Sequence, residues 1–360
     1  MGPVVAFLLL LLSSAQSRSA ADLGRAGWAA INAGHAAEAA ATFDEALKKS
    51  PANPSLLLGA GVAAHLGGRP DDARRWLGDA LRQDPTLTSA SLLLGELLYR
   101  ANDLAGAISV YEQALANAPQ NAQLAKKLEA WRAESDLHSR FGHRLGDHFT
   151  VLFEGPAEAR LAERAVTLLE AAYWRIGTAL NTYPVDVITV VLYTREQFRY
   201  ITQSPAWAGG LFDGRIRLPV QGALQNPAEF ERVLTHEFTH ALIRSVAPRN
   251  VPQWLNEGLA VTFEGSNATE RDARLRAANT RPALSSLEGS FASLDRPSAV
   301  LAYAQSAAAV QAMLDLGGPN AIAGLLVDLG RGLPFADAFE RNMLVSYAAF
   351  RQTLSSSELP

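Results

Sequence analysis

The chain has 360 residues, 48% hydrophobic and 19% charged, so it is long enough for two or more domains and has the composition of a globular protein. Its formal net charge of −4 gives no reason to expect a surface that binds nucleic acid. The absence of cysteine excludes disulfides, thiol catalysis and cysteine-ligated zinc, so any bound metal must rest on histidines and carboxylates.

Residues 1–17 have the features of a secretory signal peptide. An apolar run at 4–12 breaks into small polar residues, and the pairs of small residues at 13 and 15 or at 15 and 17 suit a signal peptidase. The run is too short for a relaxed membrane span, although an uncleaved anchor stays the alternative. We therefore expect an exported protein, periplasmic or secreted, that meets a membrane only if this segment is retained.

Residues 20–136 repeat with a period of 34 residues. The small residues let paired helices approach closely, and the proline ends the second helix of each pair. The pattern resembles three tetratricopeptide repeats and predicts an all-α solenoid, with residues 122–134 as a more charged capping helix. The recurring positions are Gly27, Gly61 and Gly95; Ala39, Ala73 and Ala107; Phe43, Leu77 and Tyr111; Ala46, Ala80 and Ala114; and Pro51, Pro85 and Pro119.

Two roles stay open for these repeats. Three repeats form a shallow concave surface of the kind that binds a peptide or a partner protein, but they would serve equally as a rigid spacer. The next segment, residues 137–147, mixes histidine with arginine, serine and glycine, which predicts a linker. Because His138, His143 and His148 share no face of a helix or a strand, we expect solvated side chains there rather than a metal site.

Residues 148–355 alternate between strand and helix patterns and predict an α+β domain. Strand patterns occupy 148–154 and 187–193, the second apolar on both sides and so expected at the centre of a sheet. Helix patterns occupy 158–179 and 196–202. Two short strand segments then flank Asp213 and Gly214, which predicts a hairpin over 209–218 with a two-residue turn.

A histidine pair follows on a predicted helix that Asn226 caps and Pro227 begins. His236 and His240 are four residues apart, so both imidazoles can reach a single Zn²⁺ while Glu237 points at the metal's water. Glu257, on a second helix opened by Pro252, is the obvious third ligand. The alternative is a helix with two hydrogen-bonded histidines and a surface glutamate.

At these residues the chain resembles the gluzincin metallopeptidases, and most of all their peptidase MA-like group, in which the sequence around Glu257 (Trp-Leu-Asn-Glu-Gly-Leu-Ala) is typical. The resemblance covers about residues 148–355. It implies a zincin-like α+β fold, zinc held by His236, His240 and Glu257, and Glu237 as general base. It also suggests that the hairpin at 209–218 supplies an edge strand for an extended substrate, with a plain core hairpin as the alternative.

The chain departs from these peptidases in two ways. Sixteen residues separate His240 from Glu257, so the connection at 247–252 must turn tightly. Some gluzincins place an aspartate four residues after the ligand glutamate to orient a histidine; here that position is Val261, and Glu264 is the alternative orienting residue.

Residues 303–306 predict the start of a helix, and helix patterns return at 322–329 and 335–354. Tyr303 is our candidate for the tyrosine with which related peptidases hydrogen-bond the developing oxyanion, against a core or capping tyrosine. Together these features predict a zinc-dependent peptidase that acts on a peptide or protein substrate. The competing interpretation is a non-catalytic exported repeat scaffold with a degenerate peptidase fold.

Overall fold

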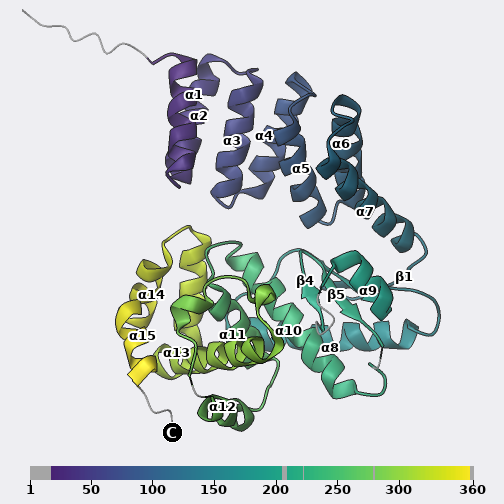
Figure 1. Ribbon diagram of the computed structural model, residues 1–360, viewed down its shortest axis with the longest axis vertical. Helices are drawn as coiled ribbons and strands as arrows, with labels where there is room; N and C mark the ends of the chain where they lie inside the picture. Colours follow the sequence, from purple (N-terminus) through teal and green to yellow (C-terminus); the bar gives the residue numbers. More distant parts are fainter. Residues whose placement is uncertain (1–17, 205–208, 222, 279, 357–360) are drawn as a thin grey trace, which may run out of the picture. The chain divides into compact units, whose positions relative to one another are not determined.

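The computed structural model describes residues 18–204, 209–221, 223–278 and 280–356 (Figure 1). The expected signal peptide at 1–17 lies outside the described residues. The chain divides into two compact units, one up to Ser91 and one from Leu92 onward. The sequence predicts the domain boundary at 137–147. In the structure, however, the third repeat and its capping helix belong to the same unit as the α+β domain.

The first unit consists of antiparallel helical pairs. Helices α1 (Ala20–Asn32) and α2 (Ala36–Lys49) form one pair, and α3 (Pro54–Leu66) and α4 (Pro70–Gln83) form the next (Figure 1). The Asn53 side chain accepts hydrogen bonds from the backbone amides of Ser55 and Leu56, which caps the start of α3. The pairs confirm the helical repeat that the 34-residue period predicts.

The repeated glycine is explained by what packs on it. A Cβ at Gly27 would lie 2.7 Å from the Phe43 ring, and one at Gly61 would lie 2.7 Å from the Leu77 side chain. Each glycine therefore accommodates the bulky residue sixteen positions later, on the second helix of its own pair. Any side chain there would force the two helices apart.

The third pair and the capping helix belong to the second unit. Helices α5 (Thr88–Arg100) and α6 (Leu104–Asn117) are followed by α7 (Ala122–His138). Gly95 and Tyr111 repeat the close packing of the earlier pairs, and the Tyr111 ring lies 4.5 Å, centroid to centroid, from that of Trp131 on α7. The expected order of three pairs and a cap is confirmed.

The predicted linker at 137–147 is wrong, and of the three histidines expected to be solvated only His143 is exposed. Helix α7 runs to His138 and strand β1 (Gly142–Leu145) follows, so most of the segment is regular structure. His138 Nε2 lies 2.7 Å from the Tyr193 hydroxyl, and His148 Nδ1 lies 2.7 Å from Glu170 Oε2. Both contacts join residues far apart in the sequence, which local composition cannot reveal.

The described part of the second unit contains a five-stranded mixed sheet of order β1-β2-β3-β5-β4. Strands β2 (Phe149–Phe153), β3 (Ile188–Tyr193) and β5 (Ile216–Pro219) are parallel. At the two edges, β1 and β4 (Leu211–Phe212) pair antiparallel with their neighbours. The apolar segment at 187–193 is the central strand, as predicted, and the hairpin supplies one edge.

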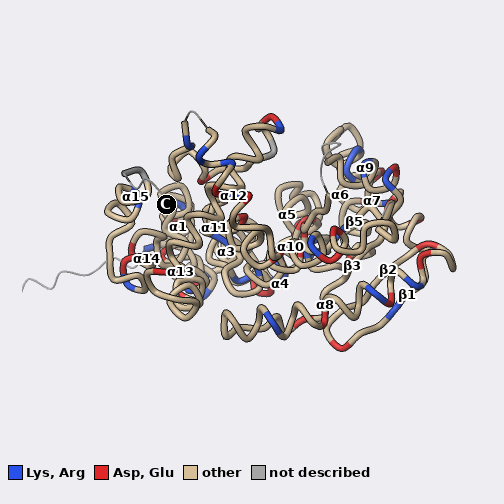
Figure 2. The backbone as a smooth tube through the Cα atoms, turned by 90° about the horizontal axis from the view of Figure 1, so that it is seen from below, with Lys and Arg blue, Asp and Glu red and all other residues tan. Residues whose placement is uncertain are grey.

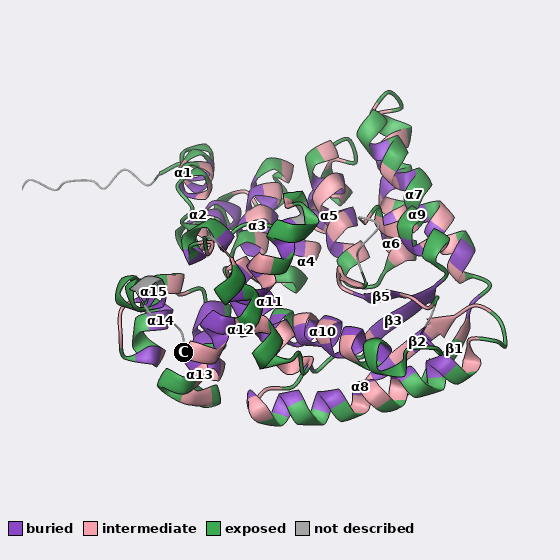
Figure 3. Ribbon diagram, turned by 60° about the horizontal axis from the view of Figure 1, so that its bottom comes forward, coloured by how far each residue is buried: buried purple, intermediate pink, exposed green. Residues whose placement is uncertain are grey.

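Helices cover both faces of this sheet (Figure 3). Helices α8 (Ala159–Ala179) and α10 (Pro227–Val246) pack on one face, where Val190 and Leu192 of β3 are buried among them. The intervening β3 side chains face α9 (Arg195–Thr202) and the end of α7 in a smaller apolar cluster. Alternate side chains of one strand thus belong to two cores, which explains its continuous apolar sequence.

The hairpin turn differs from the prediction. Leu211 pairs with Arg217 and Phe212 with Ile216, so three residues, not two, connect β4 and β5. Gly214 has a φ of +112°, which favours glycine. The Arg215 guanidinium donates to Asn102, in the turn between α5 and α6, and to Glu134 of the capping helix α7.

Helices complete the second unit after α10. They are α11 (Gln253–Phe263), α12 (Ala268–Ala277), α13 (Arg296–Gly330), α14 (Phe335–Met343) and α15 (Tyr347–Ser356), with two short 3₁₀ turns between α12 and α13. The predicted single helix at 335–354 is therefore two helices. The interruption follows α14, where Leu344 adopts a φ of +60°.

Helix α13 begins earlier than predicted. The Asp295 side chain accepts from the Ser298 amide and caps the helix, so Tyr303 lies two turns inside α13 and does not open it. A break at Gly318, with a φ of +70°, divides α13 into two segments. Length and composition would suit a membrane span, but α13 packs against α11 and α14 and carries many of the buried side chains of this unit.

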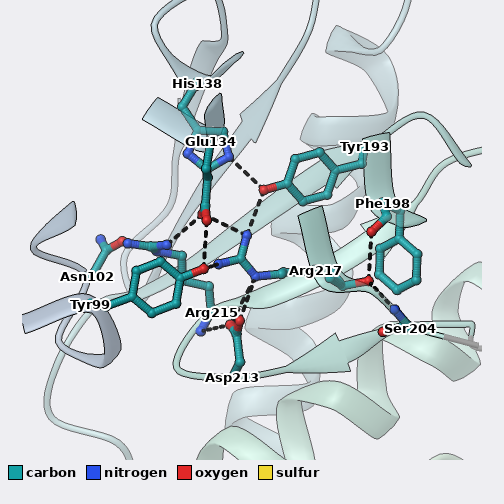
Figure 4. A network of polar contacts seen from close by, with 11 residues as sticks. Tyr99, Asn102, Glu134, His138, Tyr193, Phe198, Ser204, Asp213, Arg215 and Arg217 are labelled. Atoms are coloured by element: carbon teal, nitrogen blue, oxygen red, sulfur yellow. Dashed lines mark hydrogen bonds and ion pairs between the residues drawn. The ribbon is translucent and has the colours of Figure 1, made fainter. Parts of the chain in front are cut away.

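A buried polar network joins the third repeat to the sheet (Figure 4). Glu134 of α7 is 2% exposed and forms ion pairs of 2.8 Å with Arg215 and 2.9 Å with Arg217, both from the hairpin. Tyr99 of α5 donates to Glu134 at 2.6 Å and accepts from Arg217 at 2.8 Å. Burial alone would raise the pKa of Glu134, but the two guanidiniums outweigh burial and lower it.

We expect Glu134→Gln to destabilise the second unit by about 3–5 kcal/mol, because it removes the carboxylate paired with buried Arg215 and one of the two paired with buried Arg217, which keeps Asp213. The measurement is the midpoint of chemical denaturation. Glu112→Gln is the matched control, since the pair of Glu112 with Arg132 is about half exposed and its loss should cost less than about 1 kcal/mol. Equal effects of the two substitutions would contradict the importance of the network.

Candidate metal centre

Helix α10 positions the histidine pair. Asn226 Oδ1 accepts from the Glu229 amide at 3.2 Å and Pro227 occupies the first turn, so the helix begins where the sequence predicts. His236 and His240 consequently lie one turn apart on the same side of α10, with ring centroids 4.8 Å apart.

Helix α11 brings the third residue. The short connection turns at Asn250, whose φ is +62°, and Pro252 then precedes the first turn of α11. Gly258 fits α11 closely against α13, because a Cβ there would overlap the carbonyl oxygen of Ser306 and lie 2.7 Å from Val310 Cγ2. The tight turn and the close packing together direct Glu257 toward α10.

The three side chains converge on one point. Glu257 Oε2 lies 3.4 Å from Nε2 of His236 and 3.4 Å from Nε2 of His240. The three potential ligand atoms all lie within 4.8 Å of one another. Within the described residues, Glu257 Oε2 and His240 Nδ1 are buried without a hydrogen-bond partner. Buried polar atoms without partners are uncommon, and of these two only Glu257 Oε2 lies at the common point, because His240 faces that point through Nε2.

Neighbouring side chains fix the orientation of two of the three. His236 Nδ1 lies 2.7 Å from Glu264 Oε2, which also forms a 2.8 Å ion pair with Arg232. Gln253 donates from Nε2 to Glu257 Oε1 at 2.7 Å. Glu264 is thus the residue beside His236, seven positions after Glu257 instead of four.

Arg232 and Gln253 were missed by sequence reasoning. Arg232 comes four residues before His236, so the two share a face of α10. Gln253 likewise comes four residues before Glu257 and shares a face of α11 with it. That spacing is a signal, but it also occurs on any polar helix surface, and only the fold shows that these faces meet.

Glu237 is buried beside the edge of the sheet. It is 6% exposed, and a Cβ at Gly210 would lie 2.6 Å from Glu237 Oε1. Gly210 directly precedes β4, so the edge strand passes next to this carboxylate. Burial raises the pKa of Glu237, so this carboxylate takes up a proton more readily than an exposed glutamate does.

Charge coupling within the cluster is strong. Burial alone would lower the pKa of His236, but its contacts with Glu257 and Glu264 outweigh burial and raise that pKa to about 10. The pKa of His240 is raised by the charge of Glu257 despite burial, and the two imidazoles lower the pKa of Glu257 despite its own burial. Positive charge between the imidazoles and Glu257 is therefore strongly favoured.

Tyr303 faces the same cluster from α13. Its ring centroid lies 6.3 Å from that of His236, and among the described residues its hydroxyl has no hydrogen-bond partner. Burial and the nearby carboxylates raise the pKa of Tyr303, so the hydroxyl stays protonated and able to donate. The structure thus brings together all five predicted site residues: His236, Glu237, His240, Glu257 and Tyr303.

A cleft of about 460 Å³ opens over the cluster and is lined in part by Gly210 to Phe212 of the edge strand. A second hollow of about 690 Å³ shares Gly210, His236, Glu237 and Tyr303 with the first. The cluster therefore lies between two connected depressions, each large enough for several side chains of a peptide.

Comparison with protein families finds two kinds of match along the chain. Residues 173–349 match the sequence model of the Peptidase MA superfamily. Residues 25–88 and 68–131 match two models of the tetratricopeptide repeat. The first match contains the cluster on α10 and α11, and the other two contain the helical pairs.

Among solved structures the chain is similar to helical-repeat domains. The first TPR of Spaghetti (RPAP3) bound to the HSP90 peptide SRMEEVD is 20% identical, with a TM-score of 0.31 over 33% of this chain and 96% of that one. The Sgt2 TPR domain from Aspergillus fumigatus is 23% identical, with a TM-score of 0.32 over 36% of this chain and 86% of that one. No curated protein matches this chain.

We expect Gly258→Ala to destabilise the second unit by about 1–3 kcal/mol, because the added methyl group forces α11 away from α13. Chemical denaturation measures the change. Gly78→Ala, where the nearest side-chain atom would be 3.8 Å away on an α4 surface, should instead stabilise the protein by about 0.5–1 kcal/mol. A stabilising effect at both positions would show that α11 does not depend on this contact.

Proposed function

We propose that this chain, which carries a Peptidase MA superfamily domain behind tetratricopeptide repeats, is a zinc-dependent peptidase with His236, His240 and Glu257 as metal ligands. One observation carries the proposal, the position of Glu257 Oε2 3.4 Å from Nε2 of both histidines. Ligands held tetrahedrally about 2.1 Å from a zinc ion lie about 3.4 Å from each other.

The chemistry of the donor set also fits zinc. Two imidazoles and one carboxylate form a common set for hydrolytic zinc, and they leave a position open for water or substrate. The unpartnered Glu257 Oε2 and the raised pKa values of both histidines support a cation at this point. Glu264 beside His236 Nδ1 would fix the ring with its Nε2 toward the metal.

When bound, zinc would lower the pKa of a water molecule and polarise the scissile carbonyl. Glu237 accepts a proton from the attacking water and later delivers it to the leaving amine, so no net proton is gained or lost by the carboxylate. Tyr303 donates a hydrogen bond to the carbonyl oxygen as negative charge develops there. The free edge of β4 pairs with the backbone of an extended peptide and holds the scissile bond beside Glu237.

Two further parts of the proposal concern the rest of the chain. The helical repeats bind a partner or a substrate protein, as the repeat matches support. The apolar segment at 4–12 directs export of the protein to a periplasmic or extracellular location.

We expect Glu237→Gln to retain zinc and to lower peptide cleavage by about 10²–10⁴-fold, because the amide cannot accept the proton. Elemental analysis should find one zinc per chain in both proteins, and a quenched fluorescent peptide library measures cleavage. Cleavage by the wild type should stop when a chelator removes the metal. A wild type without zinc or cleavage would favour the exported scaffold, and full activity in the variant would reject Glu237 as the base.

We expect Glu264→Gln to weaken zinc binding by about 10–100-fold, because the carboxylate no longer orients His236 through Nδ1. Competition with a chromogenic chelator measures the affinity. Glu270→Gln is the matched control, since Glu270 is exposed and pairs with Arg274 and not with a histidine. Equal affinities in the two variants would remove Glu264 from the metal site.

A further inference from the structure

The two depressions beside the cluster differ in how their charges are paired. In the larger hollow, the arginines that line it are matched by carboxylates of the same region. Figure 2 shows acidic and basic residues scattered along a backbone that consists mostly of other residues. The pairs in the hollow are Arg232 with Glu229 and Glu264, Arg271 with Asp272, and Arg274 with Glu270.

In the smaller cleft the arginines are not paired with carboxylates. Arg244 and Arg249 line it, and neither forms an ion pair with a carboxylate among the described residues. Burial and the charge of Arg100 lower the pKa of Arg244, and burial with the charges of Arg244 and Arg100 lowers that of Arg249. These lowered values indicate three guanidiniums close enough to repel one another.

The nearby carboxylates are already engaged. Glu134 is held by Arg215 and Arg217, and Asp213 accepts from Arg217 Nε at 3.0 Å (Figure 4). Arg100, Arg244 and Arg249 therefore form a local excess of positive charge over Glu134 and Asp213, and the other two carboxylates that line the cleft, Glu237 and Glu257, belong to the metal cluster. Asp213 offsets only part of the repulsion on Arg244.

The end of α10 does not account for this excess. Arg244 lies in the last turn of α10, where a cation interacts favourably with the helix dipole. That dipole corresponds to roughly half an elementary charge, so it compensates part of one guanidinium and leaves the others.

Arg244 lies on the same helix as the proposed base Glu237, at a distance that an extended peptide can span. Arg244 follows Glu237 by seven residues, which is two turns of α10, so it lies on the same face about 10 Å further along the axis. An extended peptide advances about 3.3 Å per residue. A peptide paired with β4 and cleaved beside Glu237 would reach Arg244 with a group about three residues from the scissile bond.

We propose that Arg244 and Arg249 form a subsite that binds a carboxylate of the peptide substrate, with Arg100 adding to the positive field. The inference rests on the proposed peptidase function and adds to it a preference for anionic substrates. A guanidinium presents parallel N–H donors that match the two oxygens of a carboxylate. The carboxylate is supplied by an acidic side chain or by the C-terminus of a short peptide.

Three sets of blocked, alanine-rich quenched peptides test the subsite and separate the two sources. The first set has a free C-terminal carboxylate and no acidic side chain. The second has an amidated C-terminus and one glutamate moved along the sequence, and the third replaces that glutamate by glutamine. We expect the zinc-loaded full chain to favour the first or the second set over the third by about tenfold in kcat/KM, the usual effect of a hydrogen bond to a charged group.

The double substitution Arg244→Gln, Arg249→Gln should abolish this preference mainly through KM, and the two single variants should each lose part of it. Arg164→Gln on the exposed surface of α8 is the matched control and should keep the full preference. The preference should also decrease with added salt, because screening weakens exposed charges. Equal kcat/KM for all three sets, or an unchanged preference in the double variant, overturns the subsite.

Binding separates a failure of the subsite from a failure of the peptidase function. Fluorescence anisotropy with labelled versions of the same peptides requires no cleavage. If the chain cleaves no peptide but binds the anionic sets more tightly than the glutamine set, and loses this difference in the double variant, the subsite stands and the catalytic proposal falls. Equal Kd values for all sets overturn the subsite whatever the cleavage result.

Discussion

The arrangement of the candidate site depends on one buried carboxylate held between two imidazoles. Glu257 reaches its position because Gly258 lets α11 pack closely on α13 while the short connection returns the chain from the end of α10. The geometry has a cost, since two buried carboxylates, Glu257 and Glu237, and two partly buried histidines share a small volume. A divalent cation at the common point would lower that cost, so the strain of the cluster and its proposed use have the same origin.

A second buried carboxylate organises the other end of the sheet by the same physics. Glu134 lies between Arg215 and Arg217 and thereby fixes the hairpin that ends in the edge strand β4. The carboxylate comes from the cap of the helical repeats, so the third repeat is part of the framework of the α+β domain and not a separate module. Only the first two helical pairs form a unit of their own.

Local signals allowed the sequence to predict the elements, whereas contacts between distant residues decided the rest. The cap at Asn226 and the proline after it located the start of α10, and the spacing of His236 and His240 located the cluster. The prediction of a solvated linker was wrong because His138 is hydrogen-bonded to Tyr193, fifty-five positions away. The prediction of a two-residue turn was wrong for a similar reason, because nothing near Arg215 in the sequence indicates its contact with Glu134 of α7.

Helix α10 explains why chemistry and specificity are predictable to different degrees. One face of it carries, in order, His236, Glu237, His240 and Arg244, so the proposed ligands, base and anion subsite are fixed in register by a single rigid element. The first three form a spacing that few other functions require. An arginine four residues further is common on any helix, and its meaning depends on whether carboxylates are left to pair with it. In this fold they are not, because the network that fixes the hairpin already occupies them.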